Sequence, residues 1–223
     1  MEIQVGEKIL SKNDQIASET EKLLKEKSIF CINMMSSPGS GKTSVLEKTI
    51  PLLKDKIRIG VLEGDVATHI DAGRIEKFNI PVVQITTDAF GGSCHLSAKM
   101  VSEKIRELPL DNLDMVVIEN VGNLICPAGF RIGADADVTV LSLTEGPEKP
   151  LKYPVIFQKS SLVLVNKIDL AEILDIRLDE VKGNVRKVNP KVKIIFLSAK
   201  TGEGMDKWAD WLFKRRIEKL RAG

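Results

Sequence analysis

The sequence predicts an α/β fold: a mostly parallel, seven-stranded sheet with helices on both faces. Seven short apolar runs rich in β-branched residues recur along the chain, and helical patterns separate most of them. These runs are nearly continuous in hydrophobicity, as expected for strands that are buried on both faces of a parallel sheet. A glycine-rich turn also joins the first apolar run to a helical pattern.

The elements follow in order along the chain. An N-terminal helix is predicted over about Asn13–Lys27, ahead of the sheet. The predicted strands are Ile29–Met35, Ile57–Leu62, Val82–Ile85, Met115–Glu119, Val138–Leu143, Ser161–Asn166 and Val192–Leu197. The predicted helices between and after them are Thr43–Leu53, Ala67–Phe78, Leu96–Leu108, Arg177–Val188 and Met205–Leu220. Pro147, Pro150 and Pro154 interrupt the chain after the fifth strand, which predicts a structured surface segment there.

Composition narrows the possible classes of protein. The net charge of +2 gives no strong signal for binding a polyanion, and no apolar run is long enough to cross a bilayer. Acidic residues near the N-terminus do not fit a secretory signal. The three cysteines are widely spaced and odd in number, which argues against a disulfide framework and predicts reduced thiols in the cytoplasm.

Residues 36–43 read Ser-Ser-Pro-Gly-Ser-Gly-Lys-Thr and lie between the first strand and a helix, as in a phosphate-binding P-loop. Glycines let backbone N–H groups curl around phosphate oxygens, and the helix points its positive end at the same anion. Lys42 would reach the β- and γ-phosphates, and the Thr43 hydroxyl would bind Mg²⁺. The expected phosphate-binding residues are Gly39, Ser40, Gly41, Lys42, Thr43 and Ser44. The first position is Ser36 where the usual motif has Gly. The fold expected is therefore that of a P-loop NTPase, with a helical extension at 1–28 and a P-loop domain at 29–223, a single domain overall.

Asn166-Lys167-Ile168-Asp169 follows the sixth strand and predicts recognition of a guanine base. The Asp169 carboxylate can accept from the guanine N1–H and amino group, whereas adenine would leave it unpaired. Asn166 would bridge to the loop or the base, and the stem of Lys167 would cover the base. After the seventh strand, a backbone N–H of Ser198, Ala199 or Lys200 could bond the guanine carbonyl. An ordinary helix cap at Asp169 is the alternative interpretation.

Two carboxylates are expected near the phosphates, because ligands of open α/β sheets bind at the carboxyl ends of the strands. Asp65 follows the second strand and Glu119 ends the fourth, so both are expected to hold Mg²⁺ or its waters together with Thr43. Helix capping is the competing role for Asp65. Gly122 would turn an N–H toward the γ-phosphate. Lys42, Thr43, Asp65 and Glu119 form the expected catalytic set. No water-orienting Gln or arginine finger stands out, which predicts slow intrinsic hydrolysis unless a partner or second subunit completes the site.

Cys94, His95 and Cys126 offer two thiolates and an imidazole, which suit Zn²⁺ or Ni²⁺. Three ligands leave a coordination position open, which fits transfer better than a closed structural site. On chemistry alone, a buried apolar role for the cysteines and a capping role for the histidine remain open. Cys31 lies inside the first strand and is expected in the core.

The combination of these motifs with Gly-Gly-Ser-Cys-His-Leu and Glu-Asn-Val-Gly-Asn-Leu-Ile-Cys-Pro resembles the hydrogenase nickel-incorporation GTPases of the HypB type. The likeness runs from about Cys31 to the last helix. Cys-His-Leu and Asn-Leu-Ile-Cys-Pro separate the chain from the related urease nickel-insertion GTPases, which carry Cys-Pro-His. Some HypB-type members have an N-terminal cysteine-rich or histidine-rich nickel motif, and this sequence has neither.

The resemblance implies a GTPase that uses Mg²⁺ and helps to insert nickel into the large subunit of a hydrogenase. Cys94, His95 and Cys126 are implied ligands of Ni²⁺ or Zn²⁺ near the interface of a nucleotide-dependent homodimer, and Lys149 is implied to reach the nucleotide across it. A companion nickel-maturation protein is an implied partner, and neither nucleic acid nor membrane is expected to bind. Three alternatives stay open: a urease-type or other metal-cofactor-assembly GTPase, a P-loop kinase for a small molecule, and a nucleotide-gated interaction protein with buried cysteines.

Overall fold

All seven strands are parallel and form one sheet in the order β3-β2-β4-β1-β5-β6-β7. The structure is a computed structural model that describes residues 2–66, 70–88 and 93–222, with the backbone alone at 2–9, 70 and 222. The strands are β1 (Phe30–Ser36), β2 (Ile59–Asp65), β3 (Val82–Thr86), β4 (Met115–Glu119), β5 (Ala136–Ser142), β6 (Leu162–Asn166) and β7 (Lys193–Phe196). The α/β prediction is confirmed, because each predicted strand has an observed counterpart.

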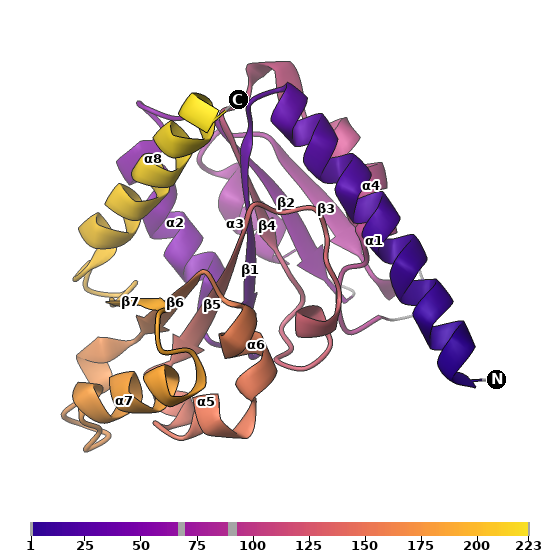
Figure 1. Ribbon diagram of the computed structural model, residues 1–223. Helices are drawn as coiled ribbons and strands as arrows, with labels where there is room; N and C mark the ends of the chain where they lie inside the picture. The colour runs from indigo at the N-terminus through magenta and orange to yellow at the C-terminus, as the bar shows by residue number, and fades with distance from the viewer. Residues whose placement is uncertain (1, 67–69, 89–92, 223) are drawn as a thin grey trace.

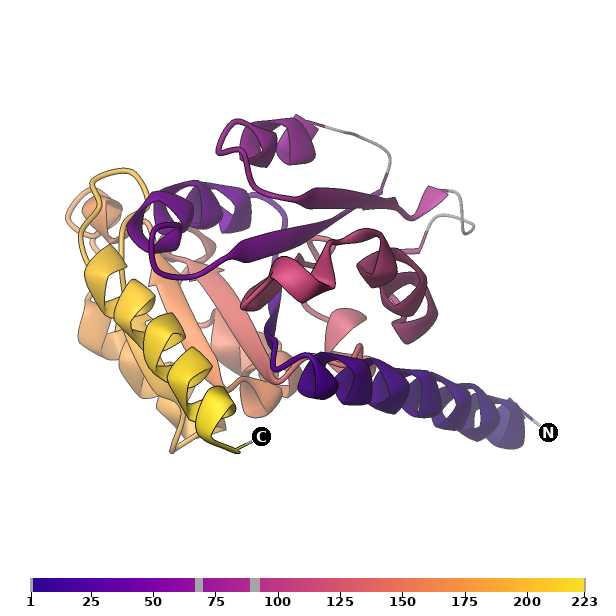
Figure 2. The same cartoon turned by 90° about the horizontal axis from the view of Figure 1, so that it is seen from above.

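Helices cover both faces of the sheet (Figures 1 and 2). They are α1 (Glu2–Glu26), α2 (Lys42–Leu53), α3 (Ile70–Glu76), α4 (Ala98–Lys104), α5 (Lys149–Lys152), α6 (Pro154–Lys159), α7 (Leu178–Val188) and α8 (Met205–Ala222). One apolar cluster joins α2, α3 and α8 to the sheet, and two further clusters join α1 and α4, and α6 and α7, to its other face. This sandwich holds the carboxyl ends of the strands in fixed positions.

The pair α2 and α8 packs over the centre of the sheet. The indole N–H of Trp208 on α8 donates to Thr49 Oγ1 on α2 at 2.9 Å. Trp208 is fully buried and stacks on Trp211, with 5.5 Å between the ring centroids. The last helix therefore fixes the helix that follows the glycine-rich turn.

The helix α1 begins at Glu2, well before the predicted start near Asn13, so that boundary was wrong. The boundary was predicted too late because Gly6 and Ser11 are poor helix formers, so local propensity gave no sign that the helix continues through them. The helix runs along α4 on the outside of the molecule (Figure 2). It lies so close to Gly133 that an added Cβ there would be 2.8 Å from the Ala17 carbonyl oxygen.

Two other regions differ in detail from the predicted elements. The helix predicted over Leu96–Leu108 is α4 followed by one short 3₁₀ turn at Ile105–Glu107. The predicted helix Ala67–Phe78 corresponds to α3, and its first three residues lie outside the described part of the chain. The proline-containing segment folds as α5 and α6, each with a proline in its first turn, where the missing N–H costs no helical hydrogen bond.

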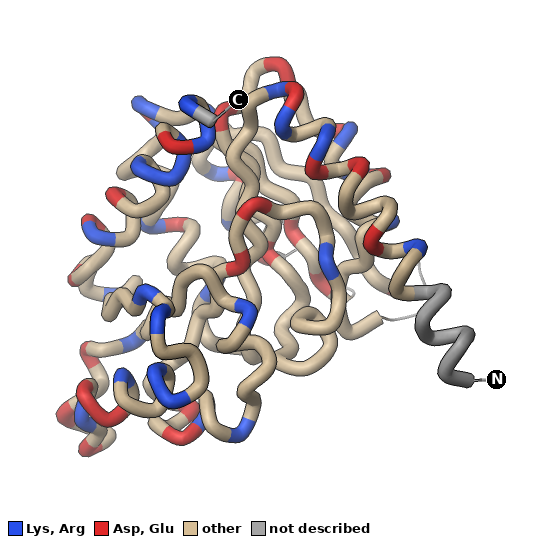
Figure 3. The backbone as a smooth tube through the Cα atoms, viewed as in Figure 1, with Lys and Arg blue, Asp and Glu red and all other residues tan. Residues whose placement is uncertain are grey.

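Charges of both signs are spread along α1, α7 and α8 (Figure 3). This agrees with the small net charge of +2. Within the described residues, no helix is long and apolar enough to cross a membrane.

Candidate functional site

The turn between β1 and α2 is built around two glycines with left-handed backbone, Gly39 with φ 72° and Gly41 with φ 94°. A side chain is strained at such angles, and a Cβ on Gly41 would lie only 2.6 Å from Asn166 Nδ2. Gly41 also precedes the first turn of α2 without a side-chain cap. The free N–H groups of that turn therefore remain available to an anion.

Lys42 and Thr43 open α2, and both side chains are buried. Lys42 Nζ donates to Ser36 Oγ at 2.9 Å, so the serine at the unusual first position of the motif accepts a hydrogen bond from the lysine. Thr43 Oγ1 donates to Glu119 Oε1 at 2.8 Å, and the same oxygen lies 4.0 Å from Lys42 Nζ. The end of β4 thus meets the first turn of α2.

A cleft of about 470 Å³ opens over this turn and contains four carboxylates. They are Glu63 and Asp65 of β2, Asp71 of α3 and Glu119 of β4. Among the described residues, Glu63 Oε2 and Glu119 Oε2 are buried without a hydrogen-bond partner. Burial and the neighbouring Glu119 raise the pKa of Glu63 to about 10, and burial raises the pKa of Glu119. Buried carboxyl oxygens without donors fit a site for a hard divalent cation.

The structure brings Asp65, Gly122 and Ser44 to the same cleft. Asp65 Oδ1 accepts from Val66 N at 2.6 Å. Gly122 lies against the P-loop, since a Cβ there would be 2.9 Å from Pro38 Cα. Ser44 lies at the boundary with the next pocket and lines both.

Besides Glu63 and Asp71, two residues of this region were missed in the sequence analysis. Arg74 of α3 lines the cleft and donates to Ser44 Oγ at 3.0 Å and to Asp71 Oδ1 at 2.9 Å. Glu145 accepts from Ser40 Oγ at 2.7 Å and also from Ser37 Oγ. Neither residue belongs to a motif, and each reaches the P-loop only through the fold. Arg74 lies three residues after Asp71 on α3, and this spacing alone gave no usable signal.

A second pocket, of about 330 Å³, adjoins the cleft and shares Gly41, Ser44 and Lys167 with it. Asn166, Asp169, Ala199 and Lys200 line it. The predicted base-binding residues therefore meet beside the P-loop, although they come from two loops that are about 30 residues apart in sequence.

Hydrogen bonds fix this second pocket. Asn166 Nδ2 donates to the Ser40 carbonyl at 2.9 Å, and its Oδ1 accepts from Ala199 N at 3.1 Å. Lys167 Nζ donates to the Gly39 carbonyl at 2.8 Å. Ser198 Oγ donates to Asp169 Oδ1 at 2.6 Å, which orients the carboxylate. Asn166 thus joins the P-loop to the loop after β7, and Asp169 retains an oxygen for a ligand.

Lys149 lies at the start of α5, apart from the residues that line either pocket. Its Nζ is 3.4 Å from Glu145 Oε2 and 4.8 Å from the centre of the Tyr153 ring. Since Glu145 accepts hydrogen bonds from two serines of the P-loop, Lys149 contacts that turn indirectly, through the Glu145 carboxylate. Within this chain it does not line the cleft, and its expected role across an interface stays a prediction.

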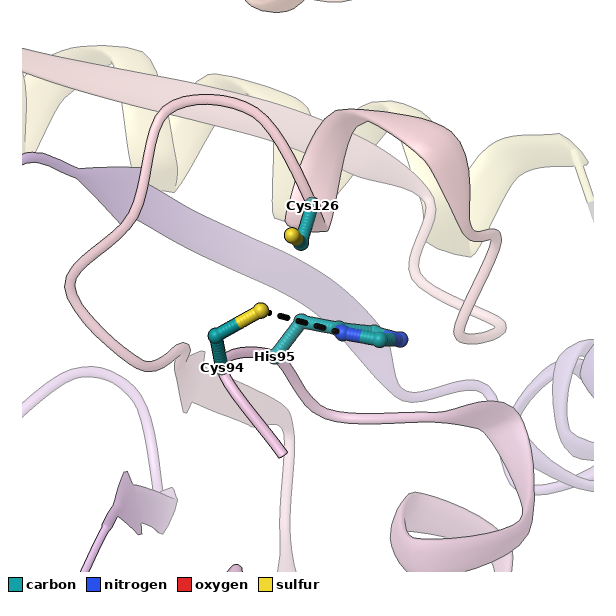
Figure 4. Close-up of side chains that lie close together, drawn as sticks. All are labelled: Cys94, His95 and Cys126. Carbon is teal, nitrogen blue, oxygen red and sulfur yellow. Dashed lines mark hydrogen bonds between the residues drawn. The ribbon is translucent and has the colours of Figure 1, made fainter. Parts of the chain in front are cut away.

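Cys94, His95 and Cys126 form a cluster whose ligand atoms all lie within 4.8 Å of one another (Figure 4). Cys94 and His95 lie in the loop before α4, and Cys126 lies after β4, just ahead of a 3₁₀ turn at Pro127–Gly129. Cys94 is exposed and Cys126 is partly exposed, whereas Cys31 is buried in the core as predicted. The exposure of two thiols disfavours the alternative in which all the cysteines are buried.

The surroundings of the cluster suit metal binding. The His95 ring stacks on Phe130 with 4.2 Å between centroids, and burial lowers the pKa of His95, which favours the neutral imidazole. A hydrogen bond between the Cys126 thiol and Cys94, together with burial, raises the pKa of Cys126. Two soft thiols and an imidazole at this separation can surround one borderline metal ion and leave room for a further ligand.

Comparisons with known proteins agree with the motifs and the geometry. A sequence model described as "CobW/HypB/UreG, nucleotide-binding domain" matches residues 30–196. The hydrogenase maturation factor HypB of Azotobacter chroococcum mcd 1 is 44% identical over 220 residues, which is 99% of this chain and 71% of that protein. A hydrogenase/urease maturation factor HypB of Helicobacter pylori strain 26695 is 36% identical over 225 residues, covering 99% of this chain and 91% of that protein.

A solved structure is similar over nearly the whole fold. The crystal structure of HypB from Helicobacter pylori in complex with nickel superposes with a TM-score of 0.87 and 36% identity, covering 93% of this chain and 96% of that chain.

Proposed function

The chain belongs to the CobW/HypB/UreG nucleotide-binding family, among its hydrogenase maturation factors, and from that premise we propose that it is a GTP-hydrolysing nickel metallochaperone. The single observation that carries the proposal is the approach of two sites. Glu119 contacts Thr43 of the P-loop, and Cys126, seven residues later, lies within 4.8 Å of the ligand atoms of Cys94 and His95. A nucleotide site and a metal site are thus joined by one short segment.

Guanine selectivity is proposed to depend on Asp169. Its carboxylate lines the pocket beside the P-loop and is oriented by Ser198. Guanine presents two donors to such a carboxylate, whereas adenine presents none at the same positions. Lys167 would lie along the base, and Gly39, Ser40, Gly41, Lys42 and Thr43 would hold the phosphates.

Mg²⁺ fits the phosphate-side cleft, because two buried carboxyl oxygens there lack donors among the described residues. Thr43 and Glu119 would hold the ion directly or through water, with Asp65 beside them. When bound, the ion supplies charge neutralisation for the phosphates. Thr43 Oγ1 and Glu119 would then exchange their mutual hydrogen bond for the ion, so residue 119 responds to the nucleotide state.

Nickel is proposed to be the cargo of the Cys94, His95 and Cys126 cluster. An open cluster with an exposed thiol favours transfer, because an incoming ligand can reach the ion. Binding of GTP would order the segment from Glu119 to Cys126 and pair two chains, and hydrolysis would relax it and release nickel to a hydrogenase large subunit. Lys149 would contact the nucleotide of the second chain, and a companion nickel-maturation protein is the proposed further partner.

The test is a titration of the purified chain with Ni²⁺ and with Zn²⁺ in the presence of GDP or a non-hydrolysable GTP analogue. Absorption from thiolate-to-metal charge transfer measures binding, and Cys94→Ala serves as the variant that lacks a ligand. We expect tighter binding in the analogue state for the wild type and loss of the absorption band in Cys94→Ala. Equal affinities in the two states would remove the coupling, since a ligand without preference shifts no equilibrium.

Two other functions are separated by direct assays. A P-loop kinase would transfer phosphate to a small acceptor and would bind ATP as well as GTP, so a competition between the two nucleotides addresses it. A role in urease maturation has one specific support, the Helicobacter pylori relative whose name includes urease. Nickel transfer to hydrogenase and urease apoproteins in parallel distinguishes the two acceptors.

A further inference from the structure

Asn120 is a buried polar residue at the end of β4, 1% exposed, and it lies between the two proposed sites. It follows Glu119 in sequence and lines the phosphate-side cleft. Its backbone N–H donates to the Met34 carbonyl at 2.9 Å, which continues the ladder between β4 and β1. Asn120 therefore lies directly after the last residue of β4. Its backbone is hydrogen-bonded to the sheet, and its side chain can hydrogen-bond to the neighbouring loops.

The side-chain oxygen of Asn120 accepts two hydrogen bonds from two different loops. One comes from Val121 N at 2.9 Å, at the start of the segment that passes Gly122 and reaches Cys126. The other comes from Leu96 N at 3.1 Å, directly after His95. Both loops that carry the metal ligands thus meet at one oxygen atom.

The opposite side of the carboxamide is held by the sheet. Asn120 Nδ2 donates to Asn33 Oδ1 of β1 at 3.1 Å, and Asn33 Nδ2 donates to Asp137 Oδ1 of β5 at 2.8 Å. Asn33 is 1% exposed, so this chain of amides is shielded from water. Its direction is fixed, because each amide must present its nitrogen to the next oxygen.

Because Val121 N and Leu96 N donate to the same buried oxygen, a movement of one backbone segment affects the hydrogen bond of the other. A shift of Gly122 and Val121 on nucleotide binding would lengthen the bond from Val121, and water cannot replace that bond at a buried atom. The Leu96 bond to the same oxygen would then change as well. Leu96 is firmly placed, since its side chain is fully buried and packs over Gly64, between Glu63 and Asp65 of the cleft.

We propose that Asn120 is the positioning residue through which the nucleotide state is transmitted to the metal cluster. This inference rests on the proposed function, and it assigns the link to one carboxamide in addition to the covalent segment 119–126. Cys94 and His95 belong to a different loop from that segment, so a tertiary connection is needed for all three ligands to respond together.

The chain offers a matched control in Asn13 of α1. Asn13 Oδ1 accepts from Ala98 N at 3.0 Å, and its Nδ2 donates to the Arg131 carbonyl at 2.8 Å. Asn13 therefore supports the same two loops through a buried amide but lines neither nucleotide pocket. Removing the Asn13 side chain therefore weakens the support of the loops that carry the metal ligands. It leaves the contacts at the nucleotide pockets unchanged.

The experiment measures Ni²⁺ affinity with GDP and with a non-hydrolysable GTP analogue in the wild type, Asn120→Ala, Asn120→Asp and Asn13→Ala. We expect the wild-type ratio of the two dissociation constants to be at least about fivefold, within the usual range for coupled sites. In Asn120→Ala the ratio should fall below about twofold, whereas Asn13→Ala should weaken nickel binding in both states and keep the ratio. Asn120→Asp keeps an oxygen that can accept from Leu96 N and Val121 N, so it should recover most of the ratio.

Thermal unfolding and GDP affinity are recorded for each variant to show that it is folded. If Asn120→Ala does not fold, the comparison of Asn120→Asp with Asn13→Ala decides, and a ratio in Asn120→Asp no larger than twofold contradicts the rescue. If Asn120→Ala shows the same ratio of dissociation constants as a fully coupled wild type, Asn120 has no role in the coupling. That result leaves the proposed function intact. Equal affinities in the wild type instead overturn the coupling itself, and the role of Asn120 with it.

Discussion

Asp169 is the residue on which the choice of base depends in the proposed site. Asp169→Asn replaces one acceptor oxygen with a donor amide, which opposes the N1–H or amino group of guanine. We expect GTP affinity to fall by about two orders of magnitude, since the hydrogen bond to the guanine amino group and the negative charge on the remaining acceptor are both lost. Xanthosine triphosphate, which carries a carbonyl where guanine has the amino group, should bind the variant better than GTP does. Calorimetry with both nucleotides measures this.

The matched control for that swap is Ser198→Ala, which removes the hydroxyl that donates to Asp169 Oδ1 and keeps the carboxylate. This variant should retain its preference for GTP over xanthosine triphosphate with only moderately weaker binding. An Asp169→Asn variant that keeps full GTP affinity would show that the base is recognised elsewhere.

Asp114 supplies a pH-dependent contribution to stability away from both sites. Its carboxylate accepts from Arg58 N at 3.0 Å and Nε at 2.9 Å and from Arg216 Nη2 at 3.2 Å. The Arg58 hydrogen bonds hold the pKa of Asp114 well below its usual range. Because the pKa of Asp114 is lower in the folded than in the unfolded state, its ionised carboxylate stabilises the fold at pH values above the unfolded pKa near 4. This contribution is lost progressively as the pH falls below that value.

Asp114→Asn should therefore lower the free energy of unfolding by about 1–2 kcal/mol at pH 7, with part of the ion pairing screened by solvent. The difference from the wild type should shrink as the pH falls from 4 toward 2. Urea denaturation at several pH values measures it, and a constant difference across that range would contradict the argument.

The motif residues could be predicted from sequence because local chemistry identifies them. Gly39, Gly41 and Lys42 adopt their roles within one turn, and the requirement for left-handed glycines is local too. Asn120 and Asn13 carried no such signal, since each becomes informative only when the sheet brings distant loops to its amide. The buried pair of Glu63 and Glu119 was half predicted for the same reason: their proximity follows from the pairing of β2 with β4.

Among the elements, β2 packs against the loop before α4 at Gly64. A Cβ at this position would lie 2.7 Å from Leu96 Cδ1 and 2.9 Å from the Glu119 carbonyl oxygen. Gly64→Ala should therefore destabilise the fold by about 1–3 kcal/mol through overpacking. It should also weaken nickel binding, because Leu96 is the neighbour of His95. Thermal unfolding and metal titration measure the two effects.

Gly183→Ala is the control for that substitution. Gly183 lies in α7 with nothing within 4 Å of an added Cβ. This change should stabilise the fold by about 0.5–1 kcal/mol, because alanine is the better helix former. Nickel binding should be unchanged. A destabilising Gly183→Ala would mean that the packing argument misjudges the free space.

Element boundaries were predicted least well where local propensity and tertiary packing disagree. The first turns of α1 contain Gly6 and Ser11, yet the helix continues through them. The prolines between β5 and β6 indicated a structured segment correctly, but two short helices could not be told from turns, because each proline is compatible with both.

For the whole molecule, the resemblance to HypB-type factors is confirmed by the family match and by the curated relatives. The fold is confirmed by the similar solved structure. Dimerisation, base choice and the metal ligands stay predictions.

The proposed pairing of two chains has its own prediction at Lys149. In the presence of a GTP analogue, sedimentation should show twice the mass seen with GDP. Lys149→Ala should reduce the fraction of dimer severalfold, because its ammonium would face the phosphates of the second chain. GDP binding to the monomer should be unchanged.

Lys152→Ala serves as the comparison, since Lys152 lies on the same short helix and pairs with Glu148 at 3.1 Å in an exposed position. It should dimerise as the wild type does. Equal dimer fractions for the wild type and Lys149→Ala would remove Lys149 from the interface.

The tie between α8 and α2 has a practical consequence. The chain has two tryptophans, and the indole of one is bonded to Thr49 on the helix that begins at Lys42. Any tilt of that helix on phosphate binding alters the environment of the Trp208 indole, which is a natural fluorophore. Intrinsic emission in a stopped-flow instrument can thus follow each turnover in real time, with no dye attached to the protein or the nucleotide.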